Sequence, residues 1–338
     1  MAKKVIPLSL RVVGGIWSGI NSVMRSGLLL AAGWITFSTF YINHKVKLAP
    51  AIPADRLEFD SRAAGKLSYY ADRKGKGRPL VLIHSVNAAA SGYEMGPLFE
   101  AFRGKRPVYA LDLPGFGFSE RSAREYSPAL YAAAIAEFLE TQVKKAADVV
   151  ALSLGCEFAA QAALDCPSSF HSLAFISPSG FGKRASTSSV KAERQGLSYR
   201  VHEALSAPLW GRPLFDLIAS RPSIRFFLRR SFVGELPAAF LEYDFATSHQ
   251  PGAEIAPLYF ISGCLFNRNA LENIYEKVEQ PALVIFDRDG FTGFDLLPGL
   301  VEKKTNWHSA QISPSLGLPQ FEMLEETQKA LGEFWDAK

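Results

Sequence analysis

Cysteine is scarce in this chain, which has three cysteines among its 338 residues, at Cys156, Cys166 and Cys264. An odd number of thiols without a C-x-x-C pair argues against both a disulfide framework and a zinc site. The net charge is only +4, and no nucleic-acid-binding motif accompanies it. The P-loop, the glycine-rich dinucleotide motif and clusters of metal ligands are also missing. The sequence therefore predicts no cofactor, no metal and no nucleic-acid partner.

Charge is also sparse near the N-terminus, where the stretch from Val5 to Ile42 contains only Arg11 and Arg25. From Ile6 onward, apolar residues recur at spacings of three and four, a pattern typical of a helix lying in a membrane interface. The uncharged run 27–42 is short for a spanning helix, which needs about 17 residues or more. We interpret residues 1–50 as a membrane anchor and predict a membrane-associated protein. The alternatives are a signal peptide, which the late apolar run disfavours, and an apolar hairpin packed on the protein or on a partner subunit.

From residue 57 onward, short apolar runs alternate with helical patterns, which predicts a mostly parallel sheet flanked by helices. Between residues 183 and 280 the alternation stops and the pattern becomes helical. We interpret this insertion as a cap over the carboxyl ends of the strands, where open α/β sheets bind ligands. The predicted organisation is an anchor at 1–50, a core at 51–182, a cap at 183–280 and a second core part at 281–338. The predicted strands are 67–71, 79–84, 107–112, 149–152, 173–177, 282–286 and 310–312.

The insertion contains a basic, phenylalanine-rich run at 225–232. An amphipathic cap helix with a solvated basic face is the preferred interpretation of this run, and contact with lipid is the alternative.

A serine between two small residues follows the predicted strand 149–152. Ala151 precedes Ser153 by two positions and Gly155 follows it by two. A nucleophile elbow needs small residues at both places, because the strand and the following helix approach closely there. The pattern predicts Ser153 as a nucleophile and the N–H of Leu154, at the helix start, as one oxyanion donor.

These segments resemble the α/β-hydrolase family, and specifically its capped branch. Residues 80–85 resemble the strand that ends in His-Gly, and 112–119 are similar to the loop Asp-x-Pro-Gly-x-Gly-x-Ser. Residues 281–286 resemble the strand before the catalytic acid. The resemblance covers residues 57–338 and implies an α/β-hydrolase fold that acts on ester or other acyl substrates. It also implies that the N–H of Val86 is the second oxyanion donor.

Two positions depart from the family pattern. Gly290 stands where the acid is expected, and Asp289, one residue before it, is our candidate substitute, with Asp287 a more distant one. Gly317 stands at the histidine position, although Pro319 and Glu322 keep the expected register. Glycine cannot accept the serine proton, and a triad without its base loses several orders of magnitude in rate. The resemblance therefore predicts a slow or absent classical activity.

Six histidines are candidates to replace the missing base. His84 is predicted to be structural, and His171 and His308 to lie at the strand ends far from the site. His202 and His249 belong to the cap, from which either reaches the site if the cap folds down. His44 lies beside the anchor, and Cys156 is expected to pack rather than react.

Two functions remain open at this stage. The first is a membrane-anchored serine hydrolase that acts on a hydrophobic acyl substrate. The second is a non-catalytic protein of the same fold that binds a hydrophobic ligand or a membrane protein partner in its capped pocket.

Overall fold

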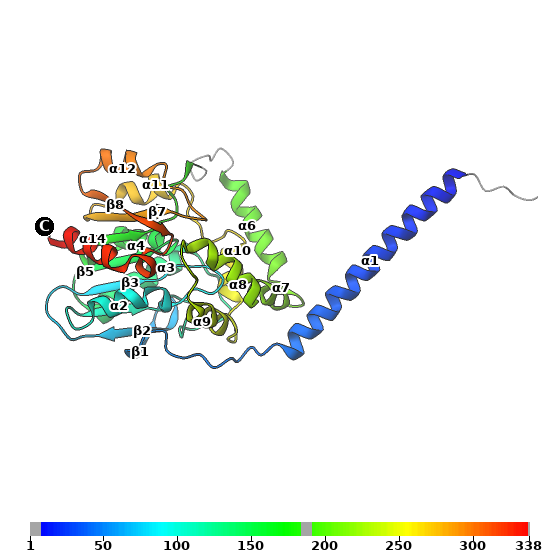
Figure 1. Ribbon diagram of the computed structural model, residues 1–338, viewed down its shortest axis with the longest axis horizontal. Helices are drawn as coiled ribbons and strands as arrows, with labels where there is room; N and C mark the ends of the chain where they lie inside the picture. Colours follow the sequence, from blue (N-terminus) through cyan, green and yellow to red (C-terminus); the bar gives the residue numbers. More distant parts are fainter. Residues whose placement is uncertain (1–7, 184–190, 337–338) are drawn as a thin grey trace, which may run out of the picture.

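A single eight-stranded sheet forms the centre of the protein (Figure 1). The computed structural model describes residues 8–183 and 191–336. The strand order is β1-β2-β4-β3-β5-β6-β7-β8. β1 and β2 pair antiparallel, as do β2 and β4, and all other neighbours are parallel. This confirms the predicted α/β fold with a mostly parallel sheet. The strands are β1 (Asp55–Ser61), β2 (Gly65–Asp72), β3 (Leu80–Ile83), β4 (Val108–Leu111), β5 (Ala147–Leu152), β6 (Phe170–Ile176), β7 (Ala282–Arg288) and β8 (Trp307–Leu316).

Helices cover both faces of the sheet because successive residues of the central strands point to opposite sides. Val81 and Ile83 join one buried cluster, whereas Leu80 and Leu82 join the other. The first cluster includes α3 and α4, and the second includes α2 and α14. The core helices are α2 (Gly96–Phe102), α3 (Pro128–Phe138), α4 (Gly155–Asp165), α12 (Leu297–Lys303), α13 (Pro319–Glu322) and α14 (Leu324–Asp336).

The insertion between β6 and β7 is mostly helical in its described part, as its sequence pattern predicts. All of these helices except the last lie beside the sheet on the side from which α1 extends (Figure 1). We call them the insertion helices: α6 (Lys191–Leu205), α7 (Gly211–Ile218), α8 (Arg221–Leu228), α9 (Ala238–Ser248), α10 (Ile255–Ile261) and α11 (Ala270–Asn273). Short single-turn helices complete the chain at η1 (Gly92–Met95), η2 (Leu139–Val143), η3 (Pro167–Ser169), η4 (Arg229–Ser231) and η5 (Tyr275–Lys277).

The last strand is longer than the sequence pattern predicts. Residues 310–312 are the predicted strand, and β8 runs from Trp307 to Leu316. It lies at the edge of the sheet, and several of its side chains are exposed. An edge strand of this kind needs few apolar residues, which is why its apolar signal is weak.

The N-terminal helix α1 (Leu8–Tyr41) projects from the body and touches it only near its C-terminal end (Figure 1). Trp34 Nε1 donates a hydrogen bond to the carbonyl of Pro213, at 2.8 Å. Ser38 Oγ donates to the buried carboxylate of Asp216, at 2.5 Å, and Arg212 Nε donates to the same carboxylate, at 3.1 Å. Helix α7 therefore holds the end of α1 through one buried acid.

Within the ranges 8–183 and 191–336, no helix combines the length and the mean hydropathy that are needed to cross a bilayer. The predicted spanning run 27–42 has 16 residues and falls almost entirely within α1, so a stretch of about 20 residues of that helix that contains it also includes Arg25. The spanning helix is therefore not supported.

The elbow helix α4 depends on aromatic packing against α3, and this generates a stability prediction. Phe158 is fully buried and stacks on Tyr131 with ring centroids 4.7 Å apart. We expect Phe158→Ala to lower the free energy of unfolding by about 3–5 kcal/mol, because it removes a buried ring and leaves a cavity. Urea denaturation followed by circular dichroism measures this loss.

The matched control is Phe226→Ala in α8, where the ring is 59% exposed. We expect a change within about 0.5 kcal/mol for this surface substitution. Equal losses for the two variants would show that α4 is not held by this stack.

Candidate active site

Ser153 lies at the carboxyl end of β5, in the tight turn that leads into α4. Its φ angle is +52°, a conformation that costs a non-glycine residue about 1–3 kcal/mol. Its N–H donates to the carbonyl of Ile176 on β6, at 2.9 Å, so the neighbouring strand holds the strained turn. The side chain is partly exposed. This is the geometry of a nucleophile elbow, in which strain lifts the hydroxyl off the sheet.

The glycine after the elbow is required by the end of the neighbouring strand. A Cβ atom at Gly155 would overlap the carbonyl oxygen of His84, just beyond β3. Any larger residue would push the start of α4 away from the loop that follows β3. Gly155 therefore brings Ser153 close to Ser85 and Val86.

Two backbone N–H groups lie unbonded near Ser153. Those of Val86 and Leu154 donate no hydrogen bond within the part of the chain that the structure describes, and both residues are buried. The N–H of Leu154 is unbonded because it stands at the start of α4, where N–H groups have no partner inside the helix. The N–H of Val86 follows the end of β3, the strand next to β5. Such a pair suits an oxyanion hole, whose donors wait for the developing negative charge.

A buried glutamate fixes the loop that carries Val86. Glu94 accepts hydrogen bonds from the N–H and the hydroxyl of Ser85, both at 2.8 Å. Asn87 Nδ2 donates to the same carboxylate, at 3.0 Å. Burial raises the pKa of Glu94 to about 7, although these donors act to lower it. Three side chains and one backbone N–H thus hold the turn between β3 and η1.

His84 is structural, in agreement with the sequence analysis. Its Nδ1 bonds the carbonyl of Ser85, at 2.5 Å, and its Nε2 accepts from the N–H of Leu113, at 2.9 Å. This network assigns the proton to Nδ1. Burial lowers the pKa of His84 to about 4, so the ring is neutral at pH 7. Both ring nitrogens are engaged, and neither is available to Ser153.

The candidate acid Asp289 stands beside Gly317, the predicted histidine position. A Cβ atom on Gly317 would lie 3.0 Å from Oδ2 of Asp289. Oδ1 of Asp289 accepts from the N–H groups of Phe291 and Thr292, at 2.7 and 3.1 Å, and burial raises the pKa of this carboxyl. Asp287 has different partners, since its carboxylate accepts from Gln311 on β8 at 2.9 Å. Of the two aspartates, Asp289 is therefore the one next to the histidine position.

One segment of the insertion covers both departures from the family pattern. We call residues 229–234, which include η4, the covering segment. A Cβ atom at Gly290 would lie 2.6 Å from the carbonyl oxygen of Arg230, closer than real Cβ contacts allow. A Cβ atom at Gly317 would lie 3.9 Å from Cβ of Ser231, and the φ angle of Gly317 is +91°, which favours glycine.

Further bonds tie the covering segment to the core. Arg230 donates to the carbonyl of Gly290, at 2.8 Å. Glu322 accepts from the N–H of Val233 at 2.6 Å and from that of Leu316 at 2.9 Å. The two glycines and the covering segment thus fit one another.

The other histidines make no hydrogen bond to Ser153 Oγ in the described ranges, which include all six. His171 and His308 lie near the starts of β6 and β8. Ser153 follows the carboxyl end of the parallel strand β5, so both histidines are at the other end of the strands. In the insertion, His202 stacks on Tyr259 with centroids 3.6 Å apart, and His249 stacks on Phe245 at 3.9 Å. His44 bonds Asp216, at 2.9 Å.

Sequence reasoning missed several buried charged residues around the elbow. Glu157, one turn into α4, is buried, and it accepts from Ser179 Oγ at 2.5 Å and from the N–H of Asn267 at 2.9 Å. Burial raises its pKa to about 7. The sequence around Glu157 and around Glu94 is equally consistent with a glutamate exposed on a helix surface. Only the hydrogen-bond partners, which come from distant segments, show that both residues are buried structural acids.

Comparisons with known proteins agree with this geometry. The model of the alpha/beta hydrolase family matches residues 80–320. A curated relative, the dihydrolipoyllysine-residue acetyltransferase component of the acetoin cleaving system of Cupriavidus necator, is 38% identical over 113 residues, which are 32% of this chain and 29% of that protein. The chain thus spans less than a third of that relative's length.

Several solved structures share the fold at low sequence identity. A membrane phospholipase A, described as a bacterial virulence factor, superposes with a TM-score of 0.64 at 19% identity, covering 98% of this chain and 97% of its own. A thermophilic esterase from Thermogutta terrifontis gives 0.62 at 16% identity, covering 84% and 99%. A probable hydrolytic enzyme from Pseudomonas aeruginosa PAO1 gives 0.64 at 17% identity, covering 86% and 97%. Because the family model extends from β3 to α13, this chain belongs to the α/β hydrolase family.

Proposed function

We propose that the protein is a membrane-associated member of this family whose Ser153 site binds ester or other acyl substrates and reacts with them slowly. The observation that carries the proposal is the pair of unbonded N–H groups, of Val86 and Leu154, at a strained serine elbow. A positive φ angle at Ser153 and two unbonded N–H groups lower the stability of the fold. Binding of the substrate's carbonyl oxygen by these N–H groups explains why the arrangement is kept.

In this proposal, Ser153 Oγ attacks the carbonyl carbon of the ester and forms a tetrahedral intermediate. The N–H groups of Val86 and Leu154 bond the oxyanion. The hydroxyl proton needs an acceptor, and water takes it because Gly317 has no side chain. Expulsion of the alcohol, which regains a proton from water, leaves an acyl-enzyme that water hydrolyses. Oxyanion donors and binding alone retain about 10³–10⁴-fold of rate enhancement, far below that of an intact triad.

A second candidate is a non-catalytic protein that binds a hydrophobic ligand or a membrane protein partner. The covering segment favours it, since Arg230 and Ser231 pack directly over the acid and base positions. A family member that hydrolyses rapidly needs a histidine at that place. Reactivity of Ser153 separates the two candidates.

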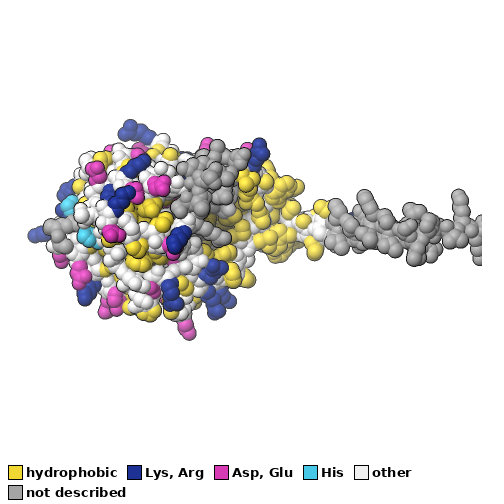
Figure 2. All heavy atoms as spheres, turned by 90° about the horizontal axis from the view of Figure 1, so that it is seen from above, with side chains coloured by type: hydrophobic (Ala, Val, Ile, Leu, Met, Phe, Trp, Pro, Cys, Tyr) yellow, Lys and Arg dark blue, Asp and Glu magenta, His cyan; other side chains and the backbone are white. Residues whose placement is uncertain are grey.

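The membrane part of the proposal is supported by an apolar surface at the junction of α1 with the insertion. Figure 2 shows hydrophobic side chains gathered where α1 leaves the body. Leu28, Leu29 and Leu30 of α1 are 68–76% exposed. Trp210 and Leu217, beside the α7 contact, are also exposed. Apolar patches of this kind on a protein surface mark interaction sites.

Basic residues accompany this surface. In α8 and η4, Arg225, Arg229 and Arg230 are exposed, together with Phe226 and Phe227. Arginines next to exposed aromatic rings favour the surface of an anionic bilayer. The similar membrane phospholipase A covers α1 as well as the core, and its name supports phospholipids as the acyl substrate class here.

The first prediction from the proposed function concerns the reactivity of Ser153. We expect a fluorophosphonate probe to label the wild-type protein at Ser153, about 10³-fold or more slowly than it labels an esterase with an intact triad, because no base activates the hydroxyl. Ser153→Ala removes the label and Ser122→Ala, in a core loop, retains it. Labelling rates are measured by in-gel fluorescence and the site by mass spectrometry. Absence of labelling in the wild type would support the non-catalytic candidate instead.

The second prediction concerns the histidine position. We expect Gly317→His to lower the free energy of unfolding by about 1–3 kcal/mol, because its φ of +91° strains a side chain. We expect less than a threefold gain in hydrolysis of p-nitrophenyl butyrate, because the carboxylate of Asp289 lies 3.0 Å from the new Cβ position and the strained backbone misplaces the ring. The control is Gly332→His in α14, where a Cβ atom meets nothing within 4 Å. A tenfold or larger gain for Gly317→His would show that a histidine at this position reaches Ser153.

The third prediction concerns membranes. We expect the protein to sediment with vesicles of phosphatidylcholine and phosphatidylglycerol at 3:1, and simultaneous serine substitution of Leu28, Leu29 and Leu30 to reduce the bound fraction at least fivefold. The loss follows from the removal of exposed apolar area. The control variant is Phe266→Ser, before α11, whose ring is 44% exposed. Equal binding of the two variants would contradict the assignment of this surface.

A further inference from the structure

A buried carboxylate lies at the point where α1 meets the body. Asp216 of α7 and Ser38 of α1 are both almost inaccessible to solvent. Asp216 accepts from Ser38 Oγ at 2.5 Å and from Arg212 Nε at 3.1 Å. His44 Nε2 bonds the same carboxylate oxygen as Ser38, at 2.9 Å. We call Ser38, His44, Arg212 and Asp216 the α1 joint, and its members come from α1, from the segment that follows it and from α7.

A flexible tether would not need a joint of this kind. Burying a carboxylate costs free energy unless hydrogen-bond donors compensate it, and here the donors come from three segments. All three donors keep their bonds in one arrangement, so the joint favours one direction of α1 relative to α7. Trp34, one turn before Ser38, adds a bond to the carbonyl of Pro213, at 2.8 Å.

The chain that follows α1 is also bonded to the insertion. The N–H of Val46 donates to the carbonyl of His249, at 3.3 Å, and Gln250 Nε2 donates to the carbonyl of Val46, at 2.6 Å. The hydroxyl of Tyr243 donates to the carbonyl of Ala49, at 3.0 Å. These partners belong to α9 or to the two residues after it. The segment between α1 and β1 therefore restrains α1 as well.

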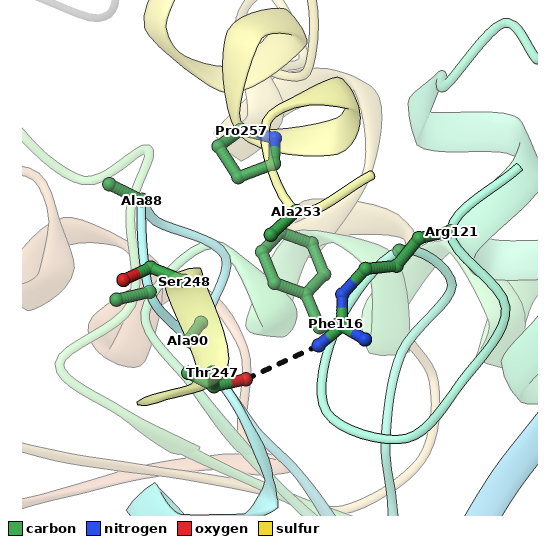
Figure 3. Close-up of a pocket in the computed structure, with 10 residues that line it drawn as sticks. Ala88, Ala90, Phe116, Arg121, Thr247, Ser248, Ala253 and Pro257 are labelled. Carbon is green, nitrogen blue, oxygen red and sulfur yellow. Dashed lines mark hydrogen bonds between the residues drawn. The ribbon is translucent and has the colours of Figure 1, made fainter. Parts of the chain in front are cut away.

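The insertion is in turn packed on the core. Figure 3 shows Arg121 of the core bonded to Thr247 of α9, at 3.3 Å. The cavity beside this bond is only about 10 Å³, so the two parts fit closely there. Tyr93 of η1 stacks on Tyr243 of α9 with ring centroids 4.7 Å apart. The direction of α1 therefore also sets the direction of the core and its serine site.

Exposed apolar side chains are concentrated on α1 and the insertion. Within the ranges 8–183 and 191–336, Phe291 is the only large exposed apolar side chain outside these two parts. Leu217 of α7 and Phe227 of α8 are each 48% exposed. Both helices lie near the base of α1 (Figure 1), and the exposed Arg225 and Arg229 accompany them. This surface thus combines apolar side chains with positive charge, as anionic bilayers require.

We propose that the α1 joint is an orienting device, which holds the outer surface of α7 and α8 against the same anionic bilayer that α1 contacts. The proposal rests on the membrane association proposed above and adds the residues that set the orientation. Ser38 and His44 are positioning residues in this role, because they act on the surface only through Asp216.

Fluorescent reporters in the full-length protein test the proposal. Single cysteines replace Leu29 in α1, Phe227 in α8 and Lys76 in a core turn, and each carries the polarity-sensitive dye nitrobenzoxadiazole. The background is Cys166→Ser/Cys264→Ser, in which the remaining Cys156 is buried. We expect vesicles of phosphatidylcholine and phosphatidylglycerol at 3:1 to raise the emission about twofold or more at 29 and 227, and to leave it unchanged at 76.

The double variant Ser38→Ala/His44→Ala removes the two donors on the α1 side and leaves Arg212 on Asp216. We expect it to keep the response to vesicles at position 29 and to lose about half or more of the response at position 227, because α1 then binds without directing the insertion.

The matched control is Thr36→Ala/Thr39→Ala. These hydroxyls bond only the carbonyls of Ala32 and Ile35 in their own helix, at 2.8 and 2.7 Å, so we expect both responses to persist. Trp34→Phe, which leaves Asp216 and its donors in place, should give a smaller loss at position 227 than the double variant. It keeps the test decisive if the double variant does not fold.

Equal responses at position 227 in the double variant and in the threonine control would overturn the proposal. So would a rise at 227 that follows protein concentration without vesicles, since a second copy of the chain would then cover this surface. A response at 29 without one at 227 in the unmodified joint would overturn the orientation alone. A silent reporter at 29 would contradict the proposed membrane association, and the orienting role with it.

Discussion

The approach of Gly155 to the carbonyl of His84 is the contact on which the site depends. It brings the start of α4 against the end of β3, so that Ser153 and Val86 follow the carboxyl ends of two neighbouring strands. The positive φ of Ser153 and the unbonded N–H of Leu154 are local consequences of the same tight turn. Their cost is distributed over the packed sheet and α4, because no isolated loop would maintain this strain.

The insertion changes what this contact can do. In the family, the loops after β7 and β8 carry an acid and a base, and here each carries a glycine under the covering segment. Gly290 admits the backbone of Arg230, whereas Gly317 adopts a positive φ angle and lies close to the carboxylate of Asp289. The covering segment and the two glycines therefore lie against one another at the predicted acid and base positions. In our proposal, a reaction at Ser153 uses the oxyanion donors without a proton relay.

Buried charged groups are concentrated around the loops that carry the site. Glu94 orients the turn before Val86, and Glu157 links α4 to the segment that follows β6. Arg121 joins the core to α9 through Thr247. Each of the two acids accepts hydrogen bonds from several donors, so both stabilise the loops that they link.

Local patterns in the sequence determined the parallel sheet, the helical insertion and the position of Ser153. Each of these features depends on a pattern that extends over only a few residues, either a short-range periodicity or small residues flanking one turn. Such a pattern is visible in the sequence before the chain is folded. The edge strand β8 was recognised only in part, because its exposed face carries no apolar signal. The structural role of His84 was recognised from its place at the end of β3.

Only the tertiary structure decided what surrounds Gly290 and Gly317, which aspartate stands beside the predicted histidine position, and which partners the buried acids have. Gly317, Asp289 and Ser231 meet from three segments that are far apart in the chain. Contacts of this kind leave no periodic signal, since each residue alone is compatible with an ordinary loop. Their meaning depends on the distances between segments, and those distances exist only in the folded chain.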